Sequence, residues 1–217
     1  MIRRLLPLLT GWALFALATP AAAQSTLAFR GFGTIAVEQQ AAKDSFDAVT
    51  GSTTLTSFGA GVQVTNIWRR LFVEIGAERA SLDGERVFVD GSTVERLGIP
   101  VEITVAPLDV MAGWRFGSGR GRLTPYAAAG LTSIGYSESS DFADDDENVD
   151  ERASGFVLAA GVEVRLRRLI HLRGEMRFRQ AGGVLGDQGV SQEYGEKNLG
   201  GLGAALAFET PAVHPHY

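Results

Sequence analysis

Residues 153–166 read ASGFVLAAGVEVRL and residues 170–180 read IHLRGEMRFRQ. In the first segment, apolar residues at even positions alternate with Gly161, Glu163 and Arg165. The second segment also carries its apolar residues at even positions, with basic and acidic residues at the odd ones. Alternation with a period of two is typical of a β-strand that has one apolar and one polar face. We therefore expect two neighbouring strands with their charged side chains on one shared face.

Six further segments alternate in the same way, and each is about as long as a tilted strand that crosses a bilayer, roughly ten residues. The eight expected strands are 27–38, 54–65, 70–81, 101–116, 122–137, 153–166, 170–180 and 198–209. Their connections are short at 66–69, 117–121 and 167–169, and long and polar at 39–53, 82–100, 138–152 and 181–197. Short turns at one end and long loops at the other indicate an all-β fold, an eight-stranded antiparallel transmembrane β-barrel with up-and-down meander order.

A soluble barrel or sandwich would alternate too, with its apolar face inward. An export signal and the regular change of loop length favour an outward apolar face that contacts lipid. Aromatic residues at the predicted periplasmic strand ends favour it as well, because such rings lie at membrane interfaces. These interface aromatics are Trp68, Trp114, Phe116 and Tyr126.

The N-terminal segment has the features of an export signal. In residues 1–23, two arginines precede an apolar run, and Ala21–Ala23 form a small-residue cleavage site. The apolar run is shorter than the roughly 20 residues that span a bilayer, so we expect cleavage rather than a retained anchor. The expected organisation is a signal peptide over 1–23, a barrel over 24–209 and a C-terminal tail over 210–217. The chain contains no Cys, so backbone pairing and packing must stabilise it.

Eleven charged residues are expected to face the interior of the barrel. They are Arg30, Glu74, Glu78, Glu102, Asp109, Arg115, Glu163, Arg165, Arg173, Glu175 and Arg177. An eight-stranded barrel is too narrow for a water channel, and unpaired charges inside it would be costly. Because both signs are interleaved on the same strands, a paired network that plugs the lumen is favoured over a gated ion or solute path.

Two details of register follow from the pattern. Val101, Ile103 and Val105 place apolar residues at odd positions, whereas the segment after Pro107 places them at even ones, which predicts a β-bulge at 106–107. A three-residue turn at 167–169 would set Glu163 opposite Arg173 and avoid like charges facing each other. We therefore expect Glu163 and Arg173 to be cross-strand partners.

The sequence gives little support for metal binding, catalysis or nucleic-acid binding. The acidic segment 141–151 could bind divalent cations, but it lacks the spacing of a calcium loop, and a solvated surface loop is favoured. His171 is more readily a polar turn or lumen residue than a catalytic one, since no nucleophile elbow, metal-spaced His pair or phosphate-binding Gly loop is present. The net charge is −5 and the basic residues are dispersed, which argues against a nucleic-acid partner. No cofactor or metal site is expected.

Residues 123–131, LTPYAAAGL, follow a strand that ends in WRFG at 114–117. This arrangement resembles the OmpA-like outer-membrane β-barrel family, in which a Thr-Pro-Tyr strand rich in small residues often follows a short turn. The resemblance implies an eight-stranded barrel in the cell outer membrane of a Gram-negative bacterium, with outer-membrane lipid and the barrel-assembly machinery as partners. Family barrels usually end on an aromatic residue, and Phe208 or Tyr217 could supply that assembly signal.

Three functions remain open at this point. We favour a non-enzymatic barrel with a polar, plugged interior that serves envelope structure or surface interaction through its long loops. The alternative is a narrow pore or transporter for small or apolar solutes, which a lumen of one charge sign or an apolar lumen would support. A lipid-modifying outer-membrane enzyme is the third. The loop residues do not identify a ligand.

Overall fold

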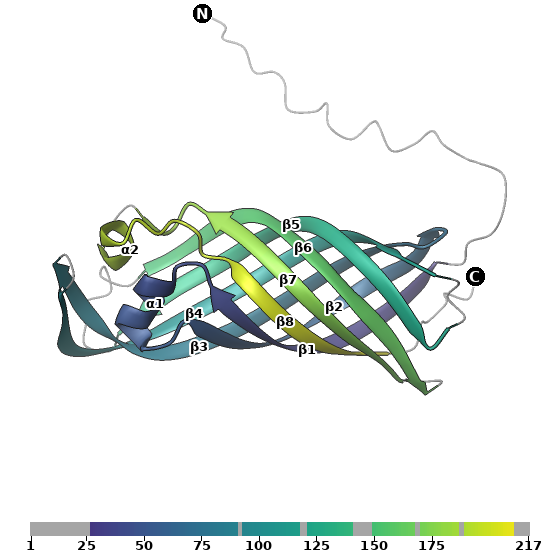
Figure 1. The fold of residues 1–217 in the computed structure, drawn as a ribbon, viewed down its shortest axis with the longest axis horizontal. Helices are drawn as coiled ribbons and strands as arrows, with labels where there is room; N and C mark the ends of the chain where they lie inside the picture. The colour runs from purple at the N-terminus through teal and green to yellow at the C-terminus, as the bar shows by residue number, and fades with distance from the viewer. Residues whose placement is uncertain are drawn as a thin grey trace, which may run out of the picture.

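Eight antiparallel strands form one closed barrel in the part of the chain that the structure describes (Figure 1). The computed structural model describes residues 27–90, 93–117, 121–140, 149–167, 170–186 and 189–210. The strands are β1 (Ala28–Gln40), β2 (Thr54–Trp68), β3 (Leu71–Asp90), β4 (Thr93–Arg115), β5 (Leu123–Ser139), β6 (Val149–Arg167), β7 (Ile170–Gly182) and β8 (Gly201–Glu209). The predicted fold class and strand order are confirmed. The expected signal peptide lies outside the described residues, as does the tail beyond Thr210.

Closure of the barrel rests on the pairing of the first and last strands. β1 pairs with β8 from Phe32↔Glu209 to Gln40↔Gly201, and every other strand pairs with its neighbour in sequence. A closed ladder leaves no sheet edge whose N–H and C=O groups would lack partners in hydrocarbon. β1 begins and β8 ends beside the short connections, here called the turn end, and the opposite end is called the loop end.

The loop end has more regular structure than the sequence predicted. The expected loop 82–100 is instead a continuation of β3 and β4, which pair as far as Asp90↔Thr93 and project beyond the other strands at the left of Figure 1. The sequence contains a signal for this hairpin, because Val87, Val89 and Val94 flank an Asp90-Gly91 turn dipeptide.

The other long connections contain two short helices. α1 (Lys43–Thr50) follows β1, and α2 (Gly189–Glu193) lies between β7 and β8. Asp44 in the first turn of α1 suits the positive end of the helix dipole, and Gly51 ends the helix in a left-handed conformation with φ 70°. No helix among the described residues is long and apolar enough to cross a membrane.

The predicted bulge in the fourth strand is wrong. β4 pairs with β5 in one unbroken register that includes Pro107↔Ile134. Val101, Ile103 and Val105 therefore face the lumen, where they are buried. The apolar residues of β4 change from odd to even positions because the lumen is apolar at the loop end and polar in the middle. The odd-numbered residues face inward along the whole stretch, and only their polarity changes.

Apolar side chains fill the lumen at the loop end. The buried residues Ala42, Phe46, Leu55, Ala80, Ile103, Val105, Ile134, Ala153, Ala181 and Leu199 form one cluster, here called the loop-end cluster. Phe46 comes from α1, which lies across this end of the barrel (Figure 1). Phe46 thus joins α1 to the apolar interior at this end of the barrel.

The outer surface of the barrel is apolar, as the prediction of a lipid-facing surface requires. Large apolar side chains point outward from every strand, and Leu131, for example, is 71% exposed. So continuous a set of exposed apolar side chains indicates a lipid environment. Phe208 is among them, whereas Tyr217 lies outside the described residues.

Three of the four predicted interface aromatics lie on the outside at the turn end. Trp68 and Phe116 are exposed, and the ring of Trp114 packs edge-on against Trp68 at 5.9 Å. The prediction for Tyr126 is wrong, because its side chain is buried in the lumen. A strand-end position is compatible with either face, and in β5 the inward face carries the even-numbered residues.

Glycines make room for the aromatic rings inside the barrel. A Cβ atom on Gly61 would lie 2.3 Å from Cζ of Phe32, and one on Gly113 would lie 2.2 Å from Cζ of Phe72. Real side chains do not approach so closely, so both rings require glycine on the neighbouring strands. These contacts give a physical reason for glycines in the strands of a narrow barrel.

Cysteine labelling tests the facing of β4, because the chain has no native Cys. In the purified, folded protein, Glu102→Cys should react rapidly with a polar maleimide because residue 102 is exposed, whereas Ile103→Cys should be protected because residue 103 is 2% exposed. Unfolding in urea should make both thiols equally reactive. Rapid labelling of residue 103 in the folded barrel would contradict the unbroken register.

Candidate functional site in the lumen

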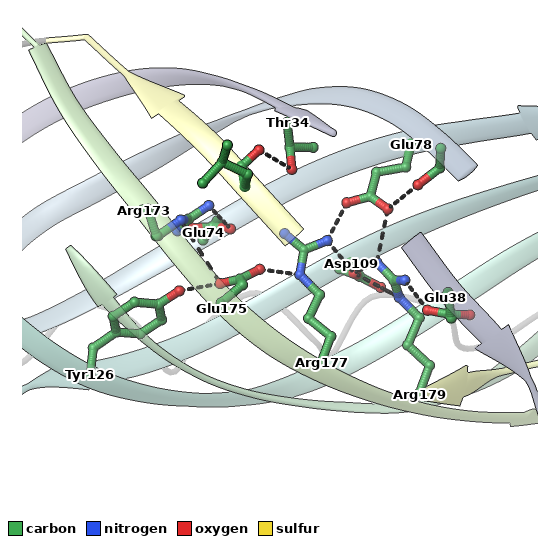
Figure 2. A network of polar contacts seen from close by, with 12 residues as sticks. Thr34, Glu38, Glu74, Glu78, Asp109, Tyr126, Arg173, Glu175, Arg177 and Arg179 are labelled. Atoms are coloured by element: carbon green, nitrogen blue, oxygen red, sulfur yellow. Dashed lines mark hydrogen bonds and ion pairs between the residues drawn. The ribbon is translucent and has the colours of Figure 1, made fainter. Parts of the chain in front are cut away.

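Charged side chains from five strands meet in the middle of the lumen. Figure 2 shows most of them. Odd-numbered residues of β7 supply three arginines and one glutamate to this group, because a strand turns every second side chain to the same face. The carboxylates that surround them come from β1, β3, β4 and β8. We call this group the lumen network: Glu38, Glu74, Glu78, Asp109, Arg173, Glu175, Arg177, Arg179 and Glu209.

Arg173 occupies the part of this network nearest the turn end. Its two terminal nitrogens both donate to the carboxylate of Glu74, and its Nε lies 3.3 Å from Glu209 Oε1. The guanidinium also lies over the ring of Phe32, 4.6 Å from the centroid. Only 1% of the Arg173 side chain is exposed. A bidentate pair and a ring face together satisfy most of the buried cation.

Arg177 and Arg179 continue the network towards the loop end (Figure 2). Arg179 Nη2 lies 2.7 Å from Asp109 Oδ2, and its Nη1 lies 2.5 Å from Glu38 Oε2. Arg177 donates to Glu175 and to Glu78, and Glu78 is shared with Arg179 at 3.3 Å. Each arginine therefore contacts at least two carboxylates on other residues.

A smaller group lies between the lumen network and the turn end. Arg30 Nη1 lies 3.3 Å from Glu163 Oε2 and also 3.3 Å from Glu209 Oε2. Arg115 Nε donates to Glu163 Oε1 at 2.8 Å, and its Nη2 donates to Gln63. Glu209 thus connects this group to Arg173 and the rest of the lumen network.

The structure places the eleven predicted lumen residues in three ways. Nine form ion pairs inside the barrel: Arg30, Glu74, Glu78, Asp109, Arg115, Glu163, Arg173, Glu175 and Arg177. Arg165 lies at the turn end, beside a cavity. The prediction for Glu102 is wrong, because its side chain is exposed on the outer face. Its inward placement depended on the predicted bulge at 106–107, and without that bulge residue 102 faces the opposite side of the strand from Asp109.

The predicted list of lumen charges omits three members of the lumen network, and Tyr126, which contacts the network, was also misplaced. The alternation of 170–180 already places Arg179 on the charged face, and Glu38 has the same parity as Arg30 in β1, so the pattern identifies both as inward. Glu209 is the last residue of β8, and the direction of a side chain at the end of a strand is hard to predict from alternation. Tyr126 was assigned to the interface, yet its hydroxyl donates to Glu175 in the lumen.

The predicted cross-strand pairs of β6 and β7 are confirmed, but the predicted ion pair is wrong. The predicted three-residue turn at 167–169 is also wrong, because Arg167 pairs with Ile170 after a register shift. Glu163 and Arg173 are cross-strand neighbours, and Arg165 faces His171. Arg173 nevertheless pairs with Glu74, Glu209 and Glu175, while Glu163 pairs with Arg30 and Arg115. A long arginine side chain reaches across a narrow lumen, so Arg173 can bind Glu74 on β3 and does not pair with Glu163, its neighbour on β6.

The chemistry of this interior is that of a plug. Charges of both signs are buried and paired, which avoids the large cost of an isolated buried charge. Among the described residues, no group of three or more His, Cys, Asp or Glu side chains is arranged to hold a metal ion. Of the acidic segment 141–151, residues 141–148 lie outside the described part of the chain.

A second cavity lies at the loop end, and Phe46 and Ile103 of the loop-end cluster form part of its wall. It has a volume of about 750 Å³ and is lined from α1, β3, β4, β5, β6 and the segment around α2. Its walls include Phe46, Ile103 and Leu185, and acidic side chains such as Glu138 and Asp150 also line it. A cavity of this size suits a small molecule, for which sites of roughly 300–1,000 Å³ are usual.

Comparison with known proteins identifies the same architecture. Residues 11–206 match the family model described as "Outer membrane protein beta-barrel domain". No curated protein matches the sequence. Three similar solved structures are Neisserial surface protein A, OprG from Pseudomonas aeruginosa and a major outer membrane protein from Thermus thermophilus.

All three structural matches share the fold at low sequence identity. Neisserial surface protein A is 11% identical, with a TM-score of 0.53 over 86% of this chain and 97% of that one. OprG is 12% identical, with a TM-score of 0.53 over 87% and 96%. The Thermus protein is 11% identical, with a TM-score of 0.54 over 86% and 99%.

A double-mutant cycle tests the cross-lumen pairing. Glu74→Gln should lower the free energy of unfolding by roughly 3 kcal/mol, because Arg173 would keep a buried charge with one carboxylate fewer. Combined with Arg173→Gln, it should give a coupling energy of about 1 to 3 kcal/mol, and the Glu163–Arg173 cycle should give much less.

Urea unfolding of the protein in lipid vesicles measures each variant. Glu85→Gln is a suitable control, because Glu85 and Arg96 form a half-exposed pair that should be worth less than about 1 kcal/mol. Equal coupling in the two Arg173 cycles would contradict the preference of Arg173 for Glu74 over Glu163.

Proposed function

The chain belongs to the outer membrane protein β-barrel domain family, and we propose that it is a non-enzymatic barrel with a closed lumen. It serves envelope structure or surface interaction through its loop end. The observation that carries this proposal is the double closure of the interior, by the lumen network and by the loop-end cluster. Membership of this family supports an outer-membrane location.

The lumen network supports closure because its side chains interlock from opposite walls. The side chains of Arg173 and Glu74 are both 1% exposed, and both terminal nitrogens of the arginine bind the same carboxylate. An ion that crosses this layer would have to break buried pairs, each of which costs several kcal/mol when one partner is lost. A second barrier follows at the loop end, where Phe46 of α1 packs among Leu55, Ile103 and other apolar side chains.

The loop end supports a surface role because its segments are held in place by specific contacts. The carboxylate of Glu196, which follows α2, accepts hydrogen bonds from the backbone N–H groups of Asp44 at 3.1 Å and Ser45 at 2.9 Å. A carboxylate at the N-terminus of α1 satisfies free N–H groups and interacts favourably with the helix dipole. The two helix-containing connections are thereby joined into one surface beside the β3–β4 hairpin.

A second candidate function is transport or capture of a small apolar solute. The specific observation in its favour is the loop-end cavity, with Phe46, Ile103 and Leu185 among its lining residues. The neutral fluorophore N-phenylnaphthylamine is a direct probe, and Val94→Glu is the control because Val94 is exposed on the β3–β4 hairpin and does not line the cavity. Saturable binding that is lost in Leu185→Glu and kept in Val94→Glu would contradict a purely surface role.

Orientation of the barrel can be tested on intact cells with single cysteines. Leu97→Cys lies on the β3–β4 hairpin at the loop end, and Arg70→Cys lies at the β2–β3 turn. If the loop end faces outward, an impermeant maleimide should label residue 97 on intact cells and residue 70 only after the outer membrane is permeabilised. The reverse pattern would overturn a surface role for the loop end.

Planar-bilayer recording tests the closed lumen. We expect the wild-type protein to give no steady conductance, because both barriers would have to open for an ion to pass. A porin inserted under the same conditions serves as the positive control. Regular current steps from the wild-type barrel would contradict the plug and favour the pore.

A further inference from the structure

A cavity at the turn end of the lumen has an unusual charge. It has a volume of about 360 Å³, and its lining includes six arginines, His171 and a single carboxylate, Glu163. The arginines are Arg30, Arg69, Arg70, Arg115, Arg122 and Arg165. We propose that this turn-end cavity binds a phosphate-type oxyanion. The inference is independent of the surface role proposed for the opposite end.

Charge balance is the first argument. Arg30 and Arg115 share Glu163, and the other carboxylate that Arg30 contacts, Glu209, is shared with Arg173 of the lumen network. Arg69, Arg70 and Arg122 have no carboxylate partner among the residues that the structure describes. Several guanidinium groups around one carboxylate produce a strong positive potential, which a bound anion would neutralise.

The positions of the donors are the second argument. Arg30 comes from β1, Arg115 from β4, and Arg70 and Arg122 from the turns before β3 and β5. Backbone pairing holds both turn residues, since the carbonyl of Arg70 accepts from Arg115 N–H at 3.1 Å and that of Arg122 accepts from Arg165 N–H at 2.9 Å. Donors that reach one cavity from several directions suit a tetrahedral oxyanion, which has acceptor oxygens on all sides.

An unsatisfied donor is the third argument. Nε of Arg30 is buried and has no hydrogen-bond partner among the described residues, although its Nη1 is paired with two carboxylates. Leaving a buried donor unpaired costs free energy, and the cost is larger for a charged group. Because the Arg30 side chain also lines the cavity, an oxyanion bound there would add an acceptor close to this guanidinium group.

The exposed aromatics place this cavity near a membrane interface. Trp68 and Phe116 lie on the outside at the same end, and Arg69 lies over the Trp68 ring, 5.2 Å from its centroid. The phosphate group could therefore belong to a lipid headgroup or to a soluble phosphate compound on the periplasmic side. Both sources present the same chemistry to the arginines.

Calorimetric titration with inorganic phosphate tests the proposal. The full-length folded protein is placed in phosphatidylcholine vesicles, and phosphate replaces chloride at constant ionic strength, because screening alone changes exposed electrostatic contacts. We expect saturable binding by the wild type. Arg70→Gln combined with Arg122→Gln should weaken it by about tenfold or more, since two charge-assisted contacts are lost.

A matched control removes the same amount of charge at the opposite end. Arg96→Gln with Arg152→Gln changes two exposed arginines of the loop end and should leave phosphate binding unchanged. Absence of saturable binding by the wild type, or an equal loss in both double variants, would overturn the proposal. Heat-modified electrophoretic mobility verifies folding, and Arg122→Gln alone replaces the double variant if that one does not fold.

A lipid arm distinguishes the two sources of phosphate. The titration of the wild type is repeated in vesicles that contain phosphatidylglycerol, whose headgroup phosphate is anionic. Vesicles with the same fraction of oleate, an anionic lipid that carries a carboxylate instead, control for the surface charge of the bilayer. Weaker binding of free phosphate in phosphatidylglycerol than in oleate supports occupation by a lipid headgroup. Equal affinity in these two vesicles supports a soluble phosphate compound.

Discussion

Closure of the backbone ladder between β1 and β8 is the constraint on which the rest of the structure depends. It satisfies the N–H and C=O groups that hydrocarbon would leave without partners, and it forces every second side chain of eight strands into one narrow lumen. The charged residues inside are consequently close to side chains from the opposite wall. Closure excludes water from the space between them, and a buried charge without water must be paired to avoid a large cost in free energy.

The lumen divides into three regions along the barrel axis. The turn end is basic, with six arginines around one cavity; the middle is neutralised by the lumen network; and the loop end is filled by the apolar loop-end cluster. Inward residues of β4 follow this order, from Arg115 through Asp109 to Ile103. The part of β4 from Ile103 to Arg115 therefore carries three kinds of inward side chain in one unbroken register.

This division assigns different kinds of contact to the two ends. The middle region and the loop-end cluster block the axis, so each end can bind partners independently of the other. At the loop end, Glu196 joins the segment after α2 to the start of α1 and gives the surface a defined shape. At the turn end, the excess of guanidinium groups favours anions. In the function proposed here, the barrel acts through its two ends and not through its centre.

The sequence by itself determined the number of strands, their order and the facing of most residues, because alternation is a local property of an extended chain. It therefore predicted that Arg173 and Glu163 face inward and are neighbours in register. Only the tertiary structure decided that Arg173 binds Glu74, that Tyr126 donates to Glu175, and that Ile103 packs in one cluster with Phe46 of α1. These contacts join residues far apart in the chain, and they depend on the width and stagger of the closed barrel, which all eight strands set together.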